Sequence, residues 1–398
     1  MVKKIVALSI AFALMLTSLL YGTIDFSTET PDNLPFEYGK GEGEDLVIES
    51  VAELEKLLNN IPSLNDYLVT SSITELNPEF KPFTMVEDGT SNVTEKRNYG
   101  NSVITTETDL YHVLEVCFTN TSVYYSCVGE STVTTTYETG ANSDSATLFD
   151  KAERTTTSFD VDIYYSKDLI MLRYNSYSLK TEEKTSVAGN WKTPEGNDSE
   201  TAMMNAMFDA VEECFGKWMT VKEMTEEDMS NLANLTEEEM MIEMLVYETC
   251  SLFSSAWTDS IVQSTEGNVD YLTRLSTFIN TSLSTAFDKI GSDYALKSEA
   301  KGPYISAITG VTLTPDALED ARAVSSFGLD SDVIVITQNV DLDYMGKEFA
   351  LAAETTFKNI GNTVVNLKGE SVPAVYDVLG ASLRKVFTDL MNQEGGAE

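Results

Sequence analysis

The stretch Leu110-Tyr-His-Val-Leu-Glu-Val-Cys-Phe118 decides the fold class, because its residues alternate with a period of two. Such a period is typical of a β-strand, in which successive side chains point to opposite faces. The two expected faces are Leu110, His112, Leu114, Val116 and Phe118, against Tyr111, Val113, Glu115 and Cys117. The first face is almost entirely apolar, so we expect it to be buried.

The same period continues on both sides of this stretch, from about residue 100 to 192. Phe159, Val161, Ile163 and Tyr165 share one face, while the polar residues between them share the other. The run 132–137 is rich in threonine, valine and tyrosine, which favour strands. The sequence therefore predicts a meander of antiparallel strands with one buried face.

Helical patterns flank this region. Ser50 and Glu53 have the spacing of a capping box and predict a helix that ends before Pro62. Residues 198 to 292 return to a helical period, and three helices are expected there. The first carries Met207, Val211, Cys214 and Trp218; the second begins at Thr236 with Glu239; the third carries Leu272, Leu275, Ile279, Leu283, Ala286 and Ile290, with Gly291 as its C-terminal cap.

Strands return near the C-terminus. Thr314-Pro315 opens a short helix, strands are expected from Val333 to about Leu367, and a last helix carries Val375, Leu379, Leu383, Val386 and Leu390. We predict an α+β fold with antiparallel β-meander regions on either side of a helical segment and with N- and C-terminal helices. The expected organisation is a signal peptide (1–22), an acidic linker (23–45), a helix plus antiparallel β region (46–196), a helical region (197–295) and a second β region with a C-terminal helix (296–398).

The first residues of the chain have the pattern of an export signal. Lys3 and Lys4 precede an unbroken apolar run from Ile5 to Leu20, and cleavage is expected after Gly22. An uncleaved N-terminal anchor is the alternative, because Leu20 stands where a small residue is usual. We expect a secreted or cell-surface protein without a membrane span in its mature chain.

Charge narrows the range of partners. The formal net charge is −38, which repels nucleic acid and anionic membrane surfaces. We therefore expect no nucleic-acid partner.

Four cysteines in an exported chain suggest two disulfides. Cys117 and Cys127 flank a turn at 119–122, and Cys214 and Cys250 flank the connection between two expected helices. The spacing favours these two pairs, and four buried free thiols are the alternative.

No pattern of residues identifies a catalytic, cofactor or metal site. His112 is the single histidine and is expected to be a core or half-buried residue. Two Ser-x-x-Lys matches, Ser298/Lys301 and Ser382/Lys385, lack the motifs that accompany them in enzymes. Three Asp-x-Asp pairs lack the rest of a calcium loop: Asp160/Asp162, Asp330/Asp332 and Asp341/Asp343. We assign no site residue and expect no cofactor.

Methionine is the one compositional signal of recognition. Nine methionines lie between residues 203 and 244: Met203, Met204, Met207, Met219, Met224, Met229, Met240, Met241 and Met244. Methionine-rich surfaces accept varied apolar partners, but a loosely specified core for these helices is the favoured interpretation.

The leading functional hypothesis is an exported non-catalytic binding protein for an apolar ligand or a protein partner, which uses its sheet surface and these Met-rich helices. Exported half-barrel carriers of lipidic molecules offer an analogy at the level of the fold, without a supporting motif. There are two alternatives. One is an extracellular carboxylate-based hydrolase, which stays open because a pair of catalytic carboxylates leaves no sequence motif. The other is a structural or adhesive surface component.

Overall fold

The structure is a computed structural model that describes residues 35–100, 102–140, 147–167, 169–193, 210–221, 234–310, 312–329, 331–344, 347–368 and 372–395. The expected signal peptide lies outside these residues. So do five of the nine clustered methionines: Met203, Met204, Met207, Met224 and Met229.

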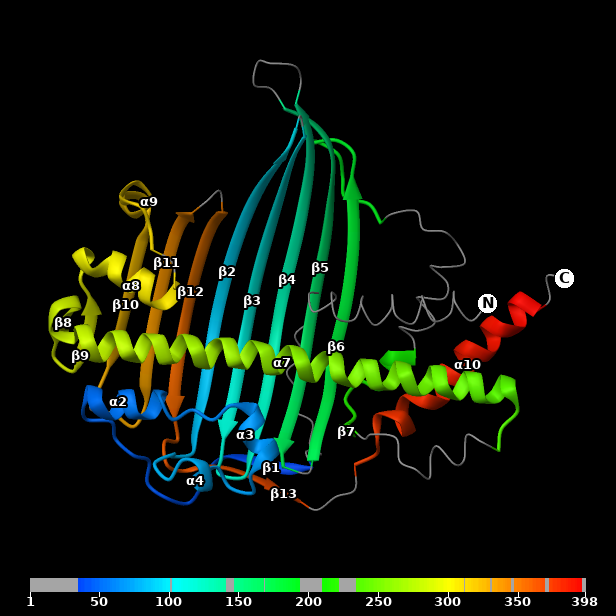
Figure 1. The fold of residues 1–398 in the computed structure, drawn as a ribbon, viewed down its shortest axis with the longest axis horizontal. Helices are drawn as coiled ribbons and strands as arrows, with labels where there is room; N and C mark the ends of the chain where they lie inside the picture. Colours follow the sequence, from blue (N-terminus) through cyan, green and yellow to red (C-terminus); the bar gives the residue numbers. More distant parts are fainter. Residues whose placement is uncertain are drawn as a thin grey trace.

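One large antiparallel sheet organises the described chain (Figure 1). Its eleven strands follow the order β7-β6-β5-β4-β3-β2-β12-β11-β10-β9-β8. The strands are β2 (Phe83–Tyr99), β3 (Ser102–Phe118), β4 (Ser122–Gly140), β5 (Thr147–Ser166), β6 (Leu169–Lys184), β7 (Met219–Thr220), β8 (Phe287–Ile290), β9 (Asp293–Leu296), β10 (Arg322–Gly328), β11 (Ile334–Tyr344) and β12 (Lys347–Lys358). The meander predicted from residue 100 onward is confirmed as the run β3 to β6.

The two predicted β regions are parts of this one sheet. Strand β2, which the sequence analysis did not assign, pairs with β3 on one side and with β12 on the other. In its register Met85 lies between Val116 and Phe357, and all three are buried. The shared apolar row joins segments that lie far apart in the sequence.

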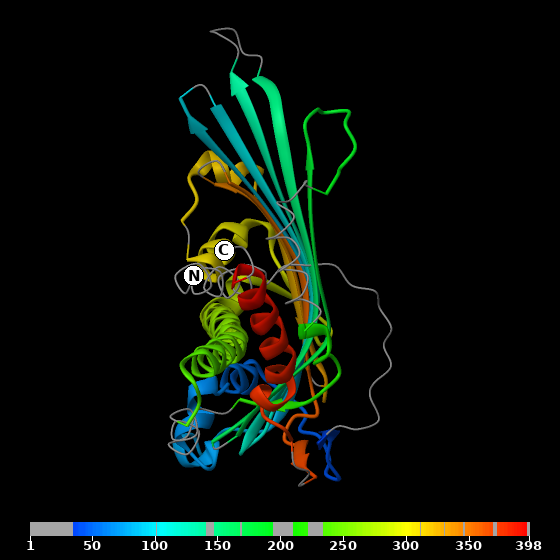
Figure 2. The same cartoon turned by 90° about the vertical axis from the view of Figure 1, so that its right-hand side faces the viewer.

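Helices cover one face of the sheet (Figure 2). They are α2 (Val51–Leu58), α3 (Leu64–Val69), α4 (Ile73–Leu76), α7 (Glu237–Ala286), the 3-10 helix η1 (Ser298–Ala300), α8 (Lys301–Thr309), α9 (Pro315–Asp320) and α10 (Val375–Gly395). Figure 2 shows the strands bowed around these helices, so we call the helix side the concave face and the other side the convex face. No helix in the described part of the chain is long and apolar enough to cross a membrane.

Three of the helix starts read from the sequence are confirmed. Ser50 and Glu53 form the capping box of α2, and Thr236 and Glu239 form that of α7. Pro315 takes the first turn of α9. The predicted C-terminal helix is α10, which buries Val375, Leu379 and Leu383.

Helix α7 corrects the prediction of separate second and third helices. It is continuous for 50 residues and runs across the strands of the sheet (Figure 1). Its end is also different, because residues 287–290 form β8 and leave Ile290 69% exposed. Gly291, with a φ of 69°, lies in the tight turn between β8 and β9 and is not a helix cap.

A second, two-stranded sheet lies on the convex face. It pairs β1 (Phe36–Lys40) with β13 (Thr363–Leu367). The expected linker therefore contains a strand, because Phe36 is fully buried against Tyr124 and Tyr164 of the large sheet. Trp218 belongs to the same cluster and is not on the helix predicted to carry it. The reason is that the chain leaves helical geometry at Gly216, whose φ is 72°.

None of the four cysteines is part of a disulfide in the structure. The predicted pair Cys117–Cys127 is wrong, because the β3–β4 register sets Cys117 opposite Tyr124 and Cys127 opposite Leu114. The two thiols consequently point to opposite faces of the sheet. Cys214 and Cys250 are buried in the same hydrophobic cluster, but the disulfide expected between them is not formed.

Candidate functional site

The lower half of the concave face is a closed hydrophobic core. Its strands present rows of apolar side chains to α7, and the members include Phe83, Met85, Val116, Phe118, Tyr125, Val161, Ile163 and Leu172. From the helix, Leu272, Leu275 and Ile279 pack against this cluster and are at most 2% exposed. This part of the face is filled and holds the fold together.

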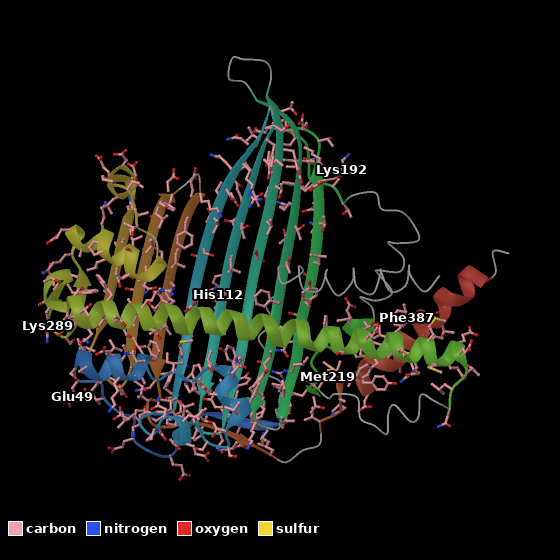
Figure 3. The ribbon with its side chains drawn as sticks, in the orientation of Figure 1. Glu49, His112, Lys192, Met219, Lys289 and Phe387 are labelled. Carbon is pink, nitrogen blue, oxygen red and sulfur yellow. The ribbon has the colours of Figure 1, made fainter. Side chains whose placement is uncertain are left out.

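His112 lies at the upper boundary of this core, close to the level at which α7 crosses the strands (Figure 3). Its Nε2 is 2.8 Å from Oε1 of Glu87 on the neighbouring strand. Glu87 is 8% exposed, and the side chain of His112 is 21% exposed. The sequence prediction of a half-buried histidine is confirmed, and the paired carboxylate is what the sequence did not reveal.

Two glycines make room for rings at this level. Gly89 and Gly129 lie on either side of His112 in the register of β2, β3 and β4. A Cβ atom at Gly89 would stand 3.1 Å from Cε1 of His112, and one at Gly129 would stand 2.6 Å from Cζ of Phe159. The rings of His112 and Phe159 therefore lie close over the backbone of adjacent strands.

Directly above, two buried hydroxyl groups have no hydrogen-bond partner. Ser131 and Thr157 face each other across β4 and β5, and both residues are fully buried. Neither hydroxyl oxygen has a partner in the structure, and neither has Nδ1 of His112. A buried hydroxyl without a partner costs about 1–3 kcal/mol, so these atoms stand out in an otherwise apolar setting.

Beyond α7, the upper half of the concave face carries apolar side chains interspersed with hydroxyl groups such as those of Thr108 and Thr155, which lie opposite Val133. Register places Val93, Leu110, Val133 and Leu179 on this face, and all four are only half-buried. No helix among the described residues covers β2 to β6 at this height (Figure 1). We call these four residues the upper concave surface.

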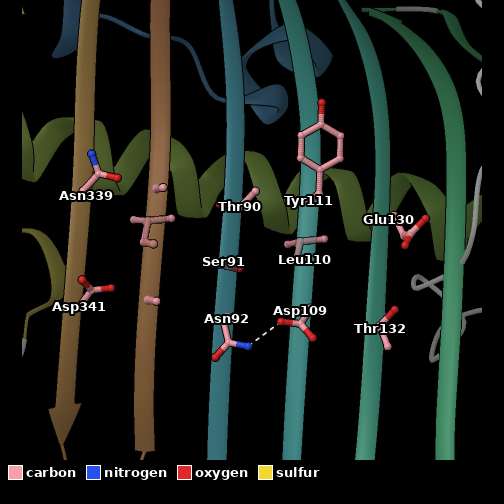
Figure 4. A pocket seen from close by; sticks show the side chains of 13 residues that line it. Thr90, Ser91, Asn92, Asp109, Leu110, Tyr111, Glu130, Thr132, Asn339 and Asp341 are labelled. Carbon is pink, nitrogen blue, oxygen red and sulfur yellow. Dashed lines mark hydrogen bonds between the residues drawn. The ribbon is translucent and has the colours of Figure 1, made fainter.

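The convex face is polar at the same height and carries a shallow hollow of about 490 Å³ (Figure 4). Ala350 and Ala352 form part of its floor. Its polar lining comes from β2, β3, β4 and β11: Thr90, Asn92, Asp109, Tyr111, Glu130, Thr132, Asn339 and Asp341. Asn92 donates a hydrogen bond of 2.6 Å to Asp109. The hollow is open and acidic.

Lower on the convex face, a buried ion pair supports the small sheet. Asp162 accepts hydrogen bonds from Tyr124 Oη at 2.6 Å, Arg173 Nε at 2.9 Å and Asn175 Nδ2 at 2.7 Å. Arg173 also stacks on Trp218, with 5.0 Å from its guanidinium carbon to the ring. Burial and the carboxylate of Asp162 both raise the pKa of Tyr124, so its hydroxyl stays protonated and donates. This cluster is structural, since every oxygen of Asp162 is occupied.

The motif residues noted in the sequence fall outside these places. Lys301 donates to the carbonyl oxygens of Glu319 and Ala321, and Ser382 donates to Glu213, so neither Ser-x-x-Lys match forms a catalytic pair. The partners Ser298 and Lys385 lie on η1 and α10.

The Asp-x-Asp pairs have separate roles. Asp160 and Asp162 are held by Asn175 and Arg173, whereas Asp341 lines the convex hollow and Asp343 follows it on β11. Asp332 precedes β11, and its partner Asp330 lies outside the described residues. Within the described ranges, no group of three or more histidine, cysteine or acidic residues is placed to hold a metal ion.

The methionine signal resolves only in part. Of the four clustered methionines that the structure describes, Met219 is fully buried, Met240 and Met241 are half-buried, and Met244 is 50% exposed. Met219 thus belongs to the core, and Met244 of α7 is the exposed member.

Comparisons with known proteins give no indication of the function. No family model matches the chain, and no curated protein matches it. A solved structure, the translocator domain of the autotransporter NalP from Neisseria meningitidis, aligns with 74% of this chain and 91% of that chain at 5% identity and a TM-score of 0.18. A score this low carries no argument about fold or function.

Proposed function

We propose that this protein is an exported, non-catalytic binding protein for an apolar ligand, which lies on the upper concave surface. The observation that carries the proposal is the polarity difference between the two faces of the same strands. At one height, Val133 and Leu110 face the concave side, while their neighbours Thr132 and Asp109 face the convex hollow. Half-exposed apolar side chains gathered on one face of a bowed sheet are typical of a ligand surface.

The lower core supports this role. Leu272, Leu275 and Ile279 of α7 pack on the rows beneath them, so the lower half of the sheet is a filled core from which the upper strands extend. The single histidine and its carboxylate partner close the lower end of the surface.

A charge on the upper concave surface tests the proposal. Val133→Asp places a carboxylate on the concave face, and Thr134→Asp places the same carboxylate one residue along β4, on the convex face. Binding of Nile red to the folded protein, followed by fluorescence, gives the affinity of each variant. We expect Val133→Asp to weaken binding at least about tenfold, because the ligand would have to desolvate the charge. Thr134→Asp should leave the affinity unchanged.

Equal affinities in the two variants would show that the dye does not occupy the concave face. Circular dichroism of each variant provides the control for folding.

A further inference from the structure

The polar atoms at the lower end of the upper concave surface indicate which kind of apolar ligand is bound. Resting on the function proposed above, we propose that the ligand is an amphiphile whose head group is an uncharged hydrogen-bond donor, an alcohol or an amide, seated at His112, Ser131 and Thr157. Its hydrocarbon chain lies on the upper concave surface.

Two buried hydroxyl groups without partners favour a ligand that forms hydrogen bonds. Ser131 and Thr157 are opposite each other in the register and are 0% exposed, and their oxygens have no partner. Directly opposite residues of an antiparallel pair have Cβ atoms about 4.5–5.5 Å apart, so both hydroxyls are within reach of a single group that enters between the side chains covering them. A ligand that hydrogen-bonds here recovers a penalty that the free protein already carries.

The hydrogen bond of His112 favours a ligand that donates. Nε2 lies 2.8 Å from Oε1 of Glu87, so the tautomer that satisfies this contact has its proton on Nε2, which donates to the carboxylate. Nδ1 then holds a lone pair, points away from Glu87 and has no partner. Ser131 is a diagonal neighbour of His112, since Ser131 pairs with Leu110 and His112 pairs with Gly129. The free acceptor and the two free hydroxyls thus share one small region, and an acceptor requires a donor from the ligand.

The charges around this region favour an uncharged head group. Glu87 is 8% exposed and lies beside this region, and the whole chain has a formal charge of −38. A carboxylate or phosphate head group would meet this negative field without a cationic partner among these residues. A cationic head group would lose its hydration against apolar neighbours such as Leu110 and Phe159. An uncharged donor avoids both costs.

The test compares ligands of equal chain length by displacement of Nile red from the full-length protein. Monododecanoylglycerol offers two hydroxyl donors, methyl dodecanoate offers none, and dodecanoate and dodecyltrimethylammonium carry the two charges. We expect monododecanoylglycerol to bind at least about tenfold more tightly than each of the other three.

Isosteric variants assign the effect to the named atoms. Thr157→Val and Ser131→Ala should each weaken monododecanoylglycerol about fivefold to tenfold and leave methyl dodecanoate unchanged. Ser158→Ala is the matched control, because Ser158 is the next residue on β5, is 1% exposed, also has an unpartnered hydroxyl, and points to the convex face. It should change neither ligand.

The outcomes separate the two proposals. Equal affinity for monododecanoylglycerol and methyl dodecanoate, or no effect of Thr157→Val and Ser131→Ala, would overturn the head-group assignment while leaving the apolar surface intact. Tighter binding of either charged probe would overturn it as well. Failure of all four probes to displace the dye, together with equal dye binding by Val133→Asp and Thr134→Asp, would overturn the apolar surface itself.

Discussion

Replacing Asp162 with alanine should be among the most damaging single changes in this fold. The Asp162 and Arg173 side chains are 2% and 4% exposed, so the pair is almost completely desolvated. Asp162→Ala leaves the guanidinium buried without its anion, and breaking a buried pair on one side costs about 3–5 kcal/mol. Tyr124 and Asn175 each lose an acceptor as well, which adds on the order of 1 kcal/mol each, partly offset because Asn175 keeps its bond to Asp160. We expect a loss of about 4–6 kcal/mol in the free energy of unfolding.

The assay is urea unfolding at pH 7, followed by tryptophan fluorescence. Trp218 stacks on Arg173, so it reports directly on this cluster. The double variant Asp162→Ala/Arg173→Met removes both charges and fills most of the space, and it should be more stable than Asp162→Ala alone by about 2 kcal/mol or more. Glu153→Ala is the control, because its ion pair with Lys151 is exposed, and it should barely move the urea midpoint.

Two results would refute this reasoning. One is a loss of less than about 1 kcal/mol for Asp162→Ala, since a buried guanidinium cannot lose its anion so cheaply. The other is a double variant that is less stable than Asp162→Ala, since that would mean that the uncompensated charge is not what destabilises the single variant.

Three further predictions concern other parts of the fold. Burial raises the pKa of Cys117 to about 12. At pH 8 its thiol should therefore react with an alkylating reagent about a thousandfold more slowly in the native protein than after unfolding. Intact mass after alkylation measures the rate, and fast labelling of the native protein would contradict this prediction. Burial opposes ionisation of Glu243, but hydrogen bonds from Arg384 and Tyr376 outweigh it and lower the pKa of Glu243. The stabilisation by this contact between α7 and α10 is therefore fully present above the unfolded pKa of about 4.3 and is lost as the pH falls through the lower folded-state pKa of Glu243. Arg384→Ala should lower the free energy of unfolding by up to about 1 kcal/mol at pH 7 and by less at pH 3. An equal loss of stability at the two pH values would contradict this prediction. Gly129→Ala should lower the free energy of unfolding by about 1–3 kcal/mol, because its Cβ atom would stand 2.6 Å from the ring of Phe159 and 2.9 Å from a backbone oxygen. Thermal unfolding measures this loss, and an unchanged unfolding temperature would contradict the prediction.

Local features of this fold could be read from the sequence. The alternation around Leu114 predicts a strand, and the capping boxes at Ser50 and Thr236 predict helix starts, because each depends on residues only a few positions apart. The structure agrees at all three. The half-buried state of His112 follows from the same alternation.

Long-range features could not be read in this way. The pairing of Met85 with Phe357 joins residues far apart in the chain, and no local pattern encodes it. Gly291 shows a second limit, since a helix cap and a hairpin turn both favour a glycine with positive φ. The proposed pair Cys117–Cys127 failed because facing side chains across a hairpin depend on the register, which sets the two thiols on opposite faces.

The candidate site could not be predicted from the sequence either, because it too depends on the register between strands. Glu87, Ser131 and Thr157 come from three strands, and nothing distinguishes them in the sequence from the many other acidic and hydroxyl residues. Only the register brings them to one level beside His112. The glycines Gly89 and Gly129 were the available signal, because a glycine inside a strand often marks a close approach of another group.

The most direct test of an apolar ligand on the concave face is native mass spectrometry of the purified full-length protein, with monododecanoylglycerol added to a second sample. The account predicts a complex that carries one alkyl-chain ligand, that disappears on denaturation, and that is lost in Val133→Asp but kept in Thr134→Asp. A bare protein mass in both samples, or a complex that survives equally in both variants, would contradict it.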